Sequence, residues 1–214
     1  MKFLKSSVLF LIFFLPQIVF AQGIDSIFVG MPLKINPLLD KNSKNKLLFY
    51  YKQNYTDSVK NLFGSKVAVL EYDSAHNYIS IQNTPSSVIS IFTFRYLNQT
   101  ITGLIKTVGD TLKSSDLRFY KSEWESVTIN FKKPVAFDWF KPESDLENKF
   151  DTEWIKNQLV VSFVTLKYDP LKSQIVASNS SLKYISKETY SVLSDYFNTS
   201  PFVFSFNGRE WNRE

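Results

Sequence analysis

The spacing of hydrophobic residues changes along the chain from a helical period to a strand period. Residues 24–63 carry apolar positions at helical spacing. One such stripe consists of Leu47, Leu48 and Tyr51. Signals for helix starts precede these stripes at Asn36-Pro37, Ser43 and Thr56, and Gly64 provides a stop. The first section of the chain is therefore predicted to be helical.

From residue 66 onward hydrophobic and polar residues alternate with a period of two, which is typical of strands. The predicted strands are residues 67–72, 78–82, 88–97, 101–108 and 116–124, with 128–131 as a continuation or end. The connections between them are short, and short connections favour antiparallel neighbours. We therefore expect a meander of five or six strands over residues 66–131.

The remainder of the chain mixes helix and strand signals. Two Lys-Pro pairs bracket an apolar segment, Val135 to Phe140, in a loop-like setting. Further elements are a helical stripe (Leu146, Phe150, Trp154), strands at 159–168 and 174–178, a helix capped by Ser186, and a strand at 201–206 followed by an Asn207-Gly208 turn. This order predicts an α+β fold, with an antiparallel sheet, a later hairpin and a C-terminal strand covered by helices.

The first 21 residues have the features of a secretory signal peptide. Lys2 and Lys5 precede an apolar run, and Ala21 is the small residue before a cut at Gln22. The mature chain then has 193 residues, the 214 of the full sequence less 21, and carries no further segment of membrane-spanning length. We expect an exported protein, periplasmic or associated with the outer envelope. Residues 22–214 are predicted to form a single α+β domain, with two lobes (22–131 and 132–214) as the alternative.

Composition limits the chemistry that this chain can carry out by itself. It has no Cys and one His, which excludes disulfides, thiol catalysis, cysteine zinc sites and any site needing two histidines. The formal charge of +5 falls to +3 when the two lysines of the signal peptide are removed. Charges of both signs are interleaved, so no nucleic-acid partner is predicted. No cofactor or metal site is predicted either. The missing catalytic residue types favour a protein that is not an enzyme.

Two sets of residues are weak candidates for catalysis. His76 lies beside Asp73 in a predicted hairpin loop, but a nucleophile would still be needed. Glu123 and Glu125 are a carboxylate pair of the kind that glycosidases use, without an identified sugar site.

Aromatic residues are the strongest compositional signal, with 20 Phe and 11 Tyr. Most are expected in the core, including Phe92 and Phe94 on one strand face. Trp124, Trp139 and Trp211 are the predicted exposed binding surface, because carbohydrate- and protein-binding surfaces use exposed Trp.

A short pattern of Asp, then Ser or Thr, then a small or aliphatic residue occurs four times. The hydroxyl residues of these triplets are Ser26, Ser58, Ser74 and Thr111. Turns and caps explain several of these triplets, because Asp-Ser pairs start both.

Three stretches of the sequence carry a family resemblance. They are residues 27–32 (IFVGMP), residues 116–120 (DLRFY) with Trp124, and residues 201–204 (PFVF) ending at Gly208 and Trp211. With the signal peptide and the element order, they resemble an exported Bacteroidetes family catalogued as domain of unknown function 3256. The resemblance implies export and an α+β fold, and it carries over no catalytic residue. It also implies O-glycosylation at the four triplet hydroxyls.

Three functions remain open from the sequence. The first is a non-catalytic envelope protein that binds a macromolecule or supports assembly, with a protein or glycan partner. The second is a carbohydrate-binding or carbohydrate-active envelope protein. The third is a small-ligand carrier with a cavity beneath the sheet, lined by Phe92 and Phe94.

Overall fold

Seven strands form a sheet whose spatial order follows the sequence, each antiparallel to the next. The computed structural model describes residues 23–141 and 152–214. The strands are β1 (Val59–Lys60), β2 (Lys66–Asp73), β3 (Tyr78–Thr84), β4 (Ser87–Tyr96), β5 (Gln99–Val108), β6 (Ser114–Tyr120) and β7 (Ser126–Val127). The predicted meander is confirmed for β2 to β6, and the short strands β1 and β7 extend it at its two ends. The segment 128–131 does not continue it, because Asn130 and Phe131 pair with a strand of the second sheet.

A second sheet has five strands in the order β8-β12-β11-β10-β9. They are β8 (Asn130–Phe131), β9 (Val164–Asp169), β10 (Gln174–Asn179), β11 (Phe202–Phe206) and β12 (Glu210–Arg213). The predicted hairpin of β9 and β10 and the C-terminal strand β11 are present. The parallel pairing of β8 with β12 joins segments far apart in the sequence, which local patterns did not predict.

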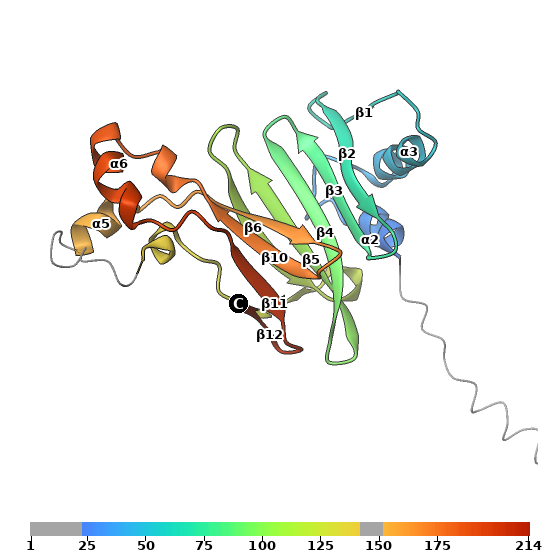
Figure 1. Cartoon of the computed structure of the whole chain (residues 1–214). Coiled ribbons are helices and arrows are strands. Elements are labelled where there is room, and N and C mark those ends of the chain that lie inside the picture. Colours follow the sequence, from blue (N-terminus) through green and yellow to red (C-terminus); the bar gives the residue numbers. More distant parts are fainter. Residues whose placement is uncertain (1–22, 142–151) are drawn as a thin grey trace, which may run out of the picture.

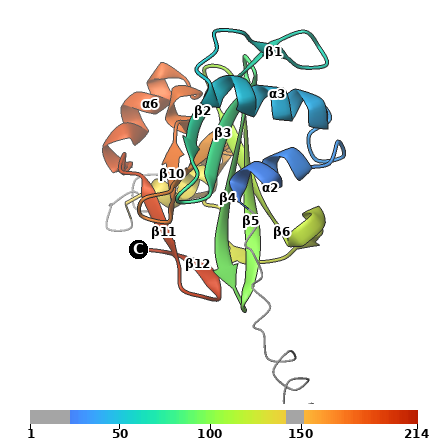
Figure 2. The same ribbon diagram turned by 90° about the vertical axis from the view of Figure 1, so that its right-hand side faces the viewer.

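Helices cover the outer side of the larger sheet and one end of the smaller one. They are α2 (Ile24–Gly30), α3 (Lys41–Lys52), α5 (Thr152–Gln158) and α6 (Lys187–Leu193). Short 3-10 turns are η1 (Ser122–Trp124), η2 (Ala136–Trp139), η3 (Ser181–Lys183) and η4 (Ser194–Tyr196). Figure 1 shows α2 and α3 on one face of the seven-stranded sheet and α5 and α6 at the opposite end of the molecule. In Figure 2, α2 and α3 lie in front of that sheet. The smaller sheet packs against the other face.

The N-terminal section is less helical than predicted. Asn36-Pro37 lies in a turn, because the Asn36 side chain is buried and forms amide hydrogen bonds with Asn83 on β3. The helix after it begins at Lys41, where the Asp40 carboxylate accepts a hydrogen bond from the Ser43 amide at 2.7 Å.

The short helical turn predicted after Thr56 was wrong. Val59 and Lys60 form β1 instead, because they pair with the edge of β2. The Ser186 cap of α6 is confirmed, since its side chain accepts a hydrogen bond from the Thr189 amide. Trp154 lies in α5, and the rest of its predicted stripe, Leu146 and Phe150, lies outside the described residues.

The larger sheet is buried on both faces, so its central strands carry apolar residues at consecutive positions. On β4, Ile89 and Ile91 face α2 and α3, whereas Phe92 faces the smaller sheet. One core lies between the sheets and the other lies beneath the two N-terminal helices. The core between the sheets combines residues from both sides of the 131/132 boundary.

Candidate functional site

The three tryptophans predicted to form an exposed binding surface are buried. Trp124 is 6% exposed, Trp139 is 1% exposed and Trp211 is 4% exposed. The prediction was wrong because other elements supply aromatic partners for each ring. Trp124 packs on Tyr120, with 5.2 Å between ring centroids, and Trp139 stacks on Phe202 at 4.1 Å. These side chains therefore stabilise the fold and do not form a docking surface.

The space beside Phe92 and Phe94, where a carried ligand was predicted, is filled by rings from the second sheet. Phe92 stacks on Tyr168 with centroids 3.9 Å apart. Phe94 contacts Phe206 at 4.7 Å and Trp211 at 5.3 Å. A small-ligand cavity at this place is incompatible with that packing.

The two catalytic candidates turn out to be surface turns. His76 Nδ1 lies 2.7 Å from Asp73 Oδ2 in the exposed β2–β3 loop. The backbone N–H and the ring of His76 hold the pKa of the Asp73 carboxyl below its ordinary value. Glu123 and Glu125 are both exposed in the turn between β6 and β7, and not on a strand. The contact between His76 and Asp73 accordingly stabilises the β2–β3 loop.

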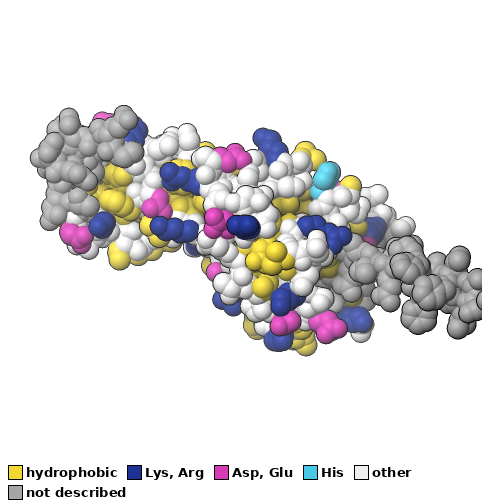
Figure 3. Space-filling model, turned by 90° about the horizontal axis from the view of Figure 1, so that it is seen from below, with side chains coloured by type: hydrophobic (Ala, Val, Ile, Leu, Met, Phe, Trp, Pro, Cys, Tyr) yellow, Lys and Arg dark blue, Asp and Glu magenta, His cyan; other side chains and the backbone are white. Residues whose placement is uncertain are grey.

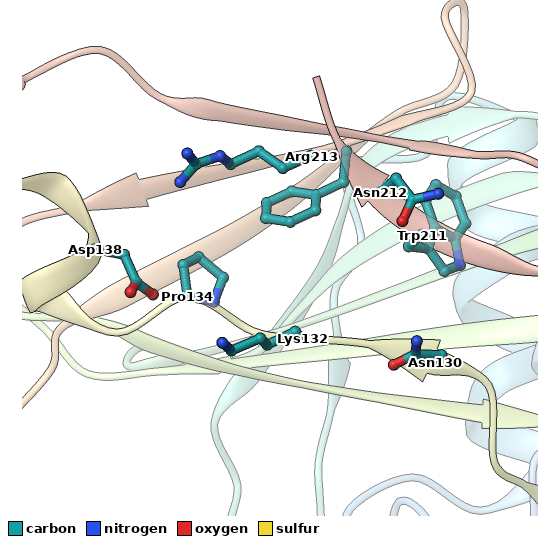
Figure 4. A pocket seen from close by; sticks show the side chains of 8 residues that line it. Asn130, Lys132, Pro134, Asp138, Trp211, Asn212 and Arg213 are labelled. Atoms are coloured by element: carbon teal, nitrogen blue, oxygen red, sulfur yellow. The ribbon is translucent and has the colours of Figure 1, made fainter. Parts of the chain in front are cut away.

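A hollow of about 280 Å³ opens beside β12 and brings together basic and amide side chains. We call it the Lys132–Arg213 hollow. It is lined by Asn130, Lys132, Pro134, Asp138, Phe204, Trp211, Asn212 and Arg213. Figure 4 shows the arginine and the lysine reaching into it from two different segments, the last strand and the chain that follows β8.

The cation of Arg213 is held in place by aromatic packing. Its guanidinium carbon lies 4.3 Å from the ring centroid of Phe202, and Phe202 stacks in turn on buried Trp139. A guanidinium over an aromatic face keeps its N–H fork free for an anion. Asp138, the acid in this hollow, already accepts a hydrogen bond from the Val135 amide at 2.8 Å. Because two cations, Lys132 and Arg213, line the hollow against this one acid, the site favours a negatively charged group.

The buried indole nitrogen of Trp211 is a further feature of this region. Within the described residues it is the one buried side-chain nitrogen or oxygen without a hydrogen-bond partner. Nearby, the Asn130 amide donates to the Glu210 carboxylate, so Asn130 is positioned by the last strand.

A second hollow, of about 670 Å³, lies between the β2–β3 loop and the β9–β10 turn. Three carboxylates line it, from Glu71, Asp73 and Asp169. Glu71 pairs with Lys167 at 3.5 Å, and Asp169 accepts the amides of the turn that follows it. A glycosidase needs one carboxyl with a raised pKa, whereas the pKa of Asp73 is lowered. The carboxylates of Glu71, Asp73 and Asp169 are thus each engaged in an ion pair or in hydrogen bonds of the surrounding loops.

Sequence reasoning missed the residues of the Lys132–Arg213 hollow. Lys132 and Arg213 lie far apart in the chain and are brought together by the parallel pairing of β8 with β12. The one local signal was the Asn207-Gly208 turn, which indicated a further strand after β11.

The remaining predicted positions have simple placements. Ser26, Ser58, Ser74 and Thr111 are all exposed, and their modification stays a prediction. The predicted cleavage residues Ala21 and Gln22 lie outside the described residues.

Residues 23–141 and 152–214 contain neither a membrane-spanning helix nor a cluster of metal-binding side chains. No helix in these ranges is long and apolar enough to cross a membrane. Across the same ranges, no three His, Asp or Glu side chains form a group that could hold a metal ion. In the view of Figure 3, basic and acidic side chains are interspersed with hydrophobic ones over the surface.

Comparisons with known proteins show similarity in fold and family. A search of curated proteins found no match. A domain of an uncharacterized protein from Porphyromonas gingivalis W83 has a similar structure, with a TM-score of 0.72 and 16% sequence identity. The similarity covers 91% of this chain and 99% of that domain. A family model described as a protein of unknown function, DUF3256, matches residues 16–211. The chain therefore belongs to the DUF3256 family.

Proposed function

We propose that this protein is a non-catalytic binding protein of the cell envelope, exported to the periplasm or the outer envelope. Its ligand is a carbohydrate that bears a carboxylate, and its site is the Lys132–Arg213 hollow. The observation that carries the proposal is the convergence of two cations on this hollow from separate segments, with Arg213 packed on Phe202.

The chemistry of the lining suits an acidic sugar. A guanidinium binds a carboxylate through two parallel hydrogen bonds, and an ammonium adds a second positive charge. Asn212 presents an exposed amide that can donate to and accept from sugar hydroxyls. Pro134 and Phe204 are largely buried and form the apolar part of the lining. The volume of the hollow fits a small ligand or one residue of a longer chain.

Calorimetric titration tests this proposal. The purified protein is titrated with glucuronate and galacturonate, and with glucose and galactose as neutral counterparts. We expect the uronates to bind and the neutral sugars to bind at least about tenfold more weakly, because the charged hydrogen bonds are lost.

Two variants assign the binding to this hollow. Arg213→Gln and Lys132→Gln each should weaken uronate binding by about tenfold or more. Arg209→Gln is the matched control, because Arg209 is exposed on the preceding turn and does not line the hollow. Equal binding of uronates and neutral sugars, or equal effects of the three variants, would contradict the proposal.

Export of the protein and the absence of cleavage of its carbohydrate ligand are tested separately. N-terminal sequencing of the protein from the periplasmic or outer-envelope fraction should begin at Gln22. Uronate oligosaccharides incubated with the protein should be recovered unchanged by chromatography. A chain that keeps Met1 in the cytoplasm would overturn the first expectation, and shortened oligosaccharides would overturn the second.

A further inference from the structure

A rigid turn next to β1 displays two large apolar side chains to solvent. Asn61 Oδ1 accepts hydrogen bonds from the amides of Phe63 at 2.9 Å and Ser65 at 3.1 Å. Gly64 closes the turn at φ +80, a conformation that favours glycine. Leu62, at the tip, donates its amide to the carbonyl of Leu38. Hydrogen bonds within the turn and to Leu38 therefore fix its conformation.

The base of this turn is anchored in the protein interior. The side chain of Asn61 is buried and donates to the carbonyl of Asn83 at 2.7 Å. Asn83 exchanges amide hydrogen bonds with buried Asn36. Buried amides with partners on several segments fix the position of a loop. The exposure of the tip is thus a property of the folded state.

Leu62 and Phe63 are 76% and 77% exposed, which is unusual for two adjacent large apolar residues. Their backbone is fixed, so they cannot turn inward without breaking the Asn61 hydrogen bonds. In Figure 2 the loop that carries β1 extends past α3 at one end of the molecule. We call this feature the Leu62–Phe63 tip.

Lysines surround the tip. Lys60 and Lys66 are directly paired across β1 and β2, and both are exposed. Lys41 is exposed at the start of α3, three residues after Leu38. In the part of the chain that the structure describes, none of these three forms an ion pair. Their ammonium groups are therefore available to an anionic surface.

The charge of the whole section is strongly biased. Residues 31–70 contain seven lysines and two aspartates, which is a net charge of +5, and they contain no arginine. Of the two acids, Asp40 is engaged in capping α3. In the sequence, the excess positive charge of the protein thus lies in the section that carries the tip, although Lys44 of this section is buried and Lys52 pairs with Asp25.

The type of residue favours a lipid surface over a protein partner. Protein interfaces are enriched in Arg, Tyr and Trp and depleted in Lys. Surfaces that bind anionic membranes combine lysines with a few protruding apolar side chains that enter the boundary between headgroups and acyl chains. The projecting tip and its lysines match the second description.

We propose that the Leu62–Phe63 tip docks onto the surface of an anionic phospholipid bilayer. The two side chains enter the boundary between headgroups and acyl chains, and Lys41, Lys60 and Lys66 contact the lipid phosphates. This places β1 and the start of α3 at the membrane, and the Lys132–Arg213 hollow belongs to a different sheet.

Vesicle sedimentation tests the proposal. The purified protein is mixed with vesicles of phosphatidylcholine alone and of phosphatidylcholine with phosphatidylglycerol. We expect binding to the anionic vesicles, weakened by salt, and about tenfold less binding to the neutral ones. No binding to anionic vesicles would overturn the proposal.

Three variants locate the contact. Leu62→Ser with Phe63→Ser, and separately Lys60→Gln with Lys66→Gln, should each reduce binding to anionic vesicles by about tenfold or more. Leu171→Ser is the matched control, because Leu171 is 76% exposed at the β9–β10 turn, away from the tip. Circular dichroism confirms that each variant is folded. An equal loss with Leu171→Ser, or no loss in either pair of variants, would show that the tip is not the contact.

Fluorescence measures whether the tip inserts into the bilayer. Phe63→Trp, compared with wild type, should show blue-shifted fluorescence and quenching by brominated lipid when anionic vesicles are added. An unshifted signal would overturn insertion. Binding to soluble polyglutamate as strong as to the vesicles would instead indicate an acidic protein partner and would also overturn the proposal.

Discussion

The ring of Phe92 lies against the ring of Tyr168, with centroids 3.9 Å apart and planes inclined by 9°. Phe92 belongs to β4 of the larger sheet and Tyr168 to β9 of the smaller one. The outer end of the Phe92 ring lies over Gly103 on β5, where an added Cβ would be 2.2 Å from the ring. The contact between the two sheets therefore depends on a glycine.

We predict that Gly103→Ala lowers the free energy of unfolding by about 1–3 kcal/mol, because Phe92 cannot move away without losing its stack on Tyr168. Urea denaturation measures the change. Gly30→Ala is the control, since no heavy atom lies within 4 Å of its added Cβ, and it should leave the midpoint unchanged or slightly higher. A Gly103→Ala curve that overlaps the wild type would show that the interface adapts freely.

A second link between the sheets is the hydroxyl of Ser115, which accepts a hydrogen bond from the buried amide of Leu166 at 2.9 Å. Ser115→Ala leaves this amide unpaired, and we expect a loss of about 1–3 kcal/mol in the free energy of unfolding. Hydrogen exchange should also become faster at the Leu166 amide. Ser126→Ala, at an exposed position, should change neither quantity. Unchanged exchange at Leu166 in the Ser115 variant would refute this role.

Stability at alkaline pH depends in part on Lys44. Its side chain is buried beneath α3 and its ammonium donates to the Met31 carbonyl. Burial lowers the pKa of Lys44 below 10.5, and the opposing effect of Asp40 is smaller. Between the lowered pKa and 10.5, the unfolded chain therefore binds more protons at this position than the folded chain does. Stability from this group rises with pH in that window.

The comparison of wild type with Lys44→Met isolates this effect. As the pH is raised from neutral toward 10.5, the wild type should gain stability relative to the variant. Melting temperatures of both proteins over this range provide the measurement. Parallel pH profiles would show that Lys44 keeps the same protonation in the folded and unfolded states.

We predict that the hydroxyl groups of the four triplets are O-glycosylated. Ser26, Ser58, Ser74 and Thr111 are exposed, so a glycosylating enzyme could reach them. The intact mass of the mature protein isolated from its cells should exceed the mass calculated from its sequence, residues 22–214. Replacing all four with Ala should remove the excess, and an isolated protein with the bare polypeptide mass would disprove the modification.

Local signals predicted the elements that short-range interactions decide. The alternation over residues 66–131 predicted the meander, because each hairpin pairs neighbours in sequence. Ser186 predicted the start of α6, because a cap satisfies amides within one turn. Val59 and Lys60 were misread as helix, since their strand exists only through pairing with β2.

The sequence by itself determined the α+β class, the order of the main elements and the absence of thiol chemistry, because these follow from local periodicity and composition. Only the tertiary structure decided which aromatic rings are exposed and which cations meet. Trp139 is buried because Phe202 stacks on it, and Arg213 shares a hollow with Lys132 because β12 pairs with β8. Both relationships join segments far apart in the chain. The local pattern of hydrophobic and polar residues does not specify which distant segments pair.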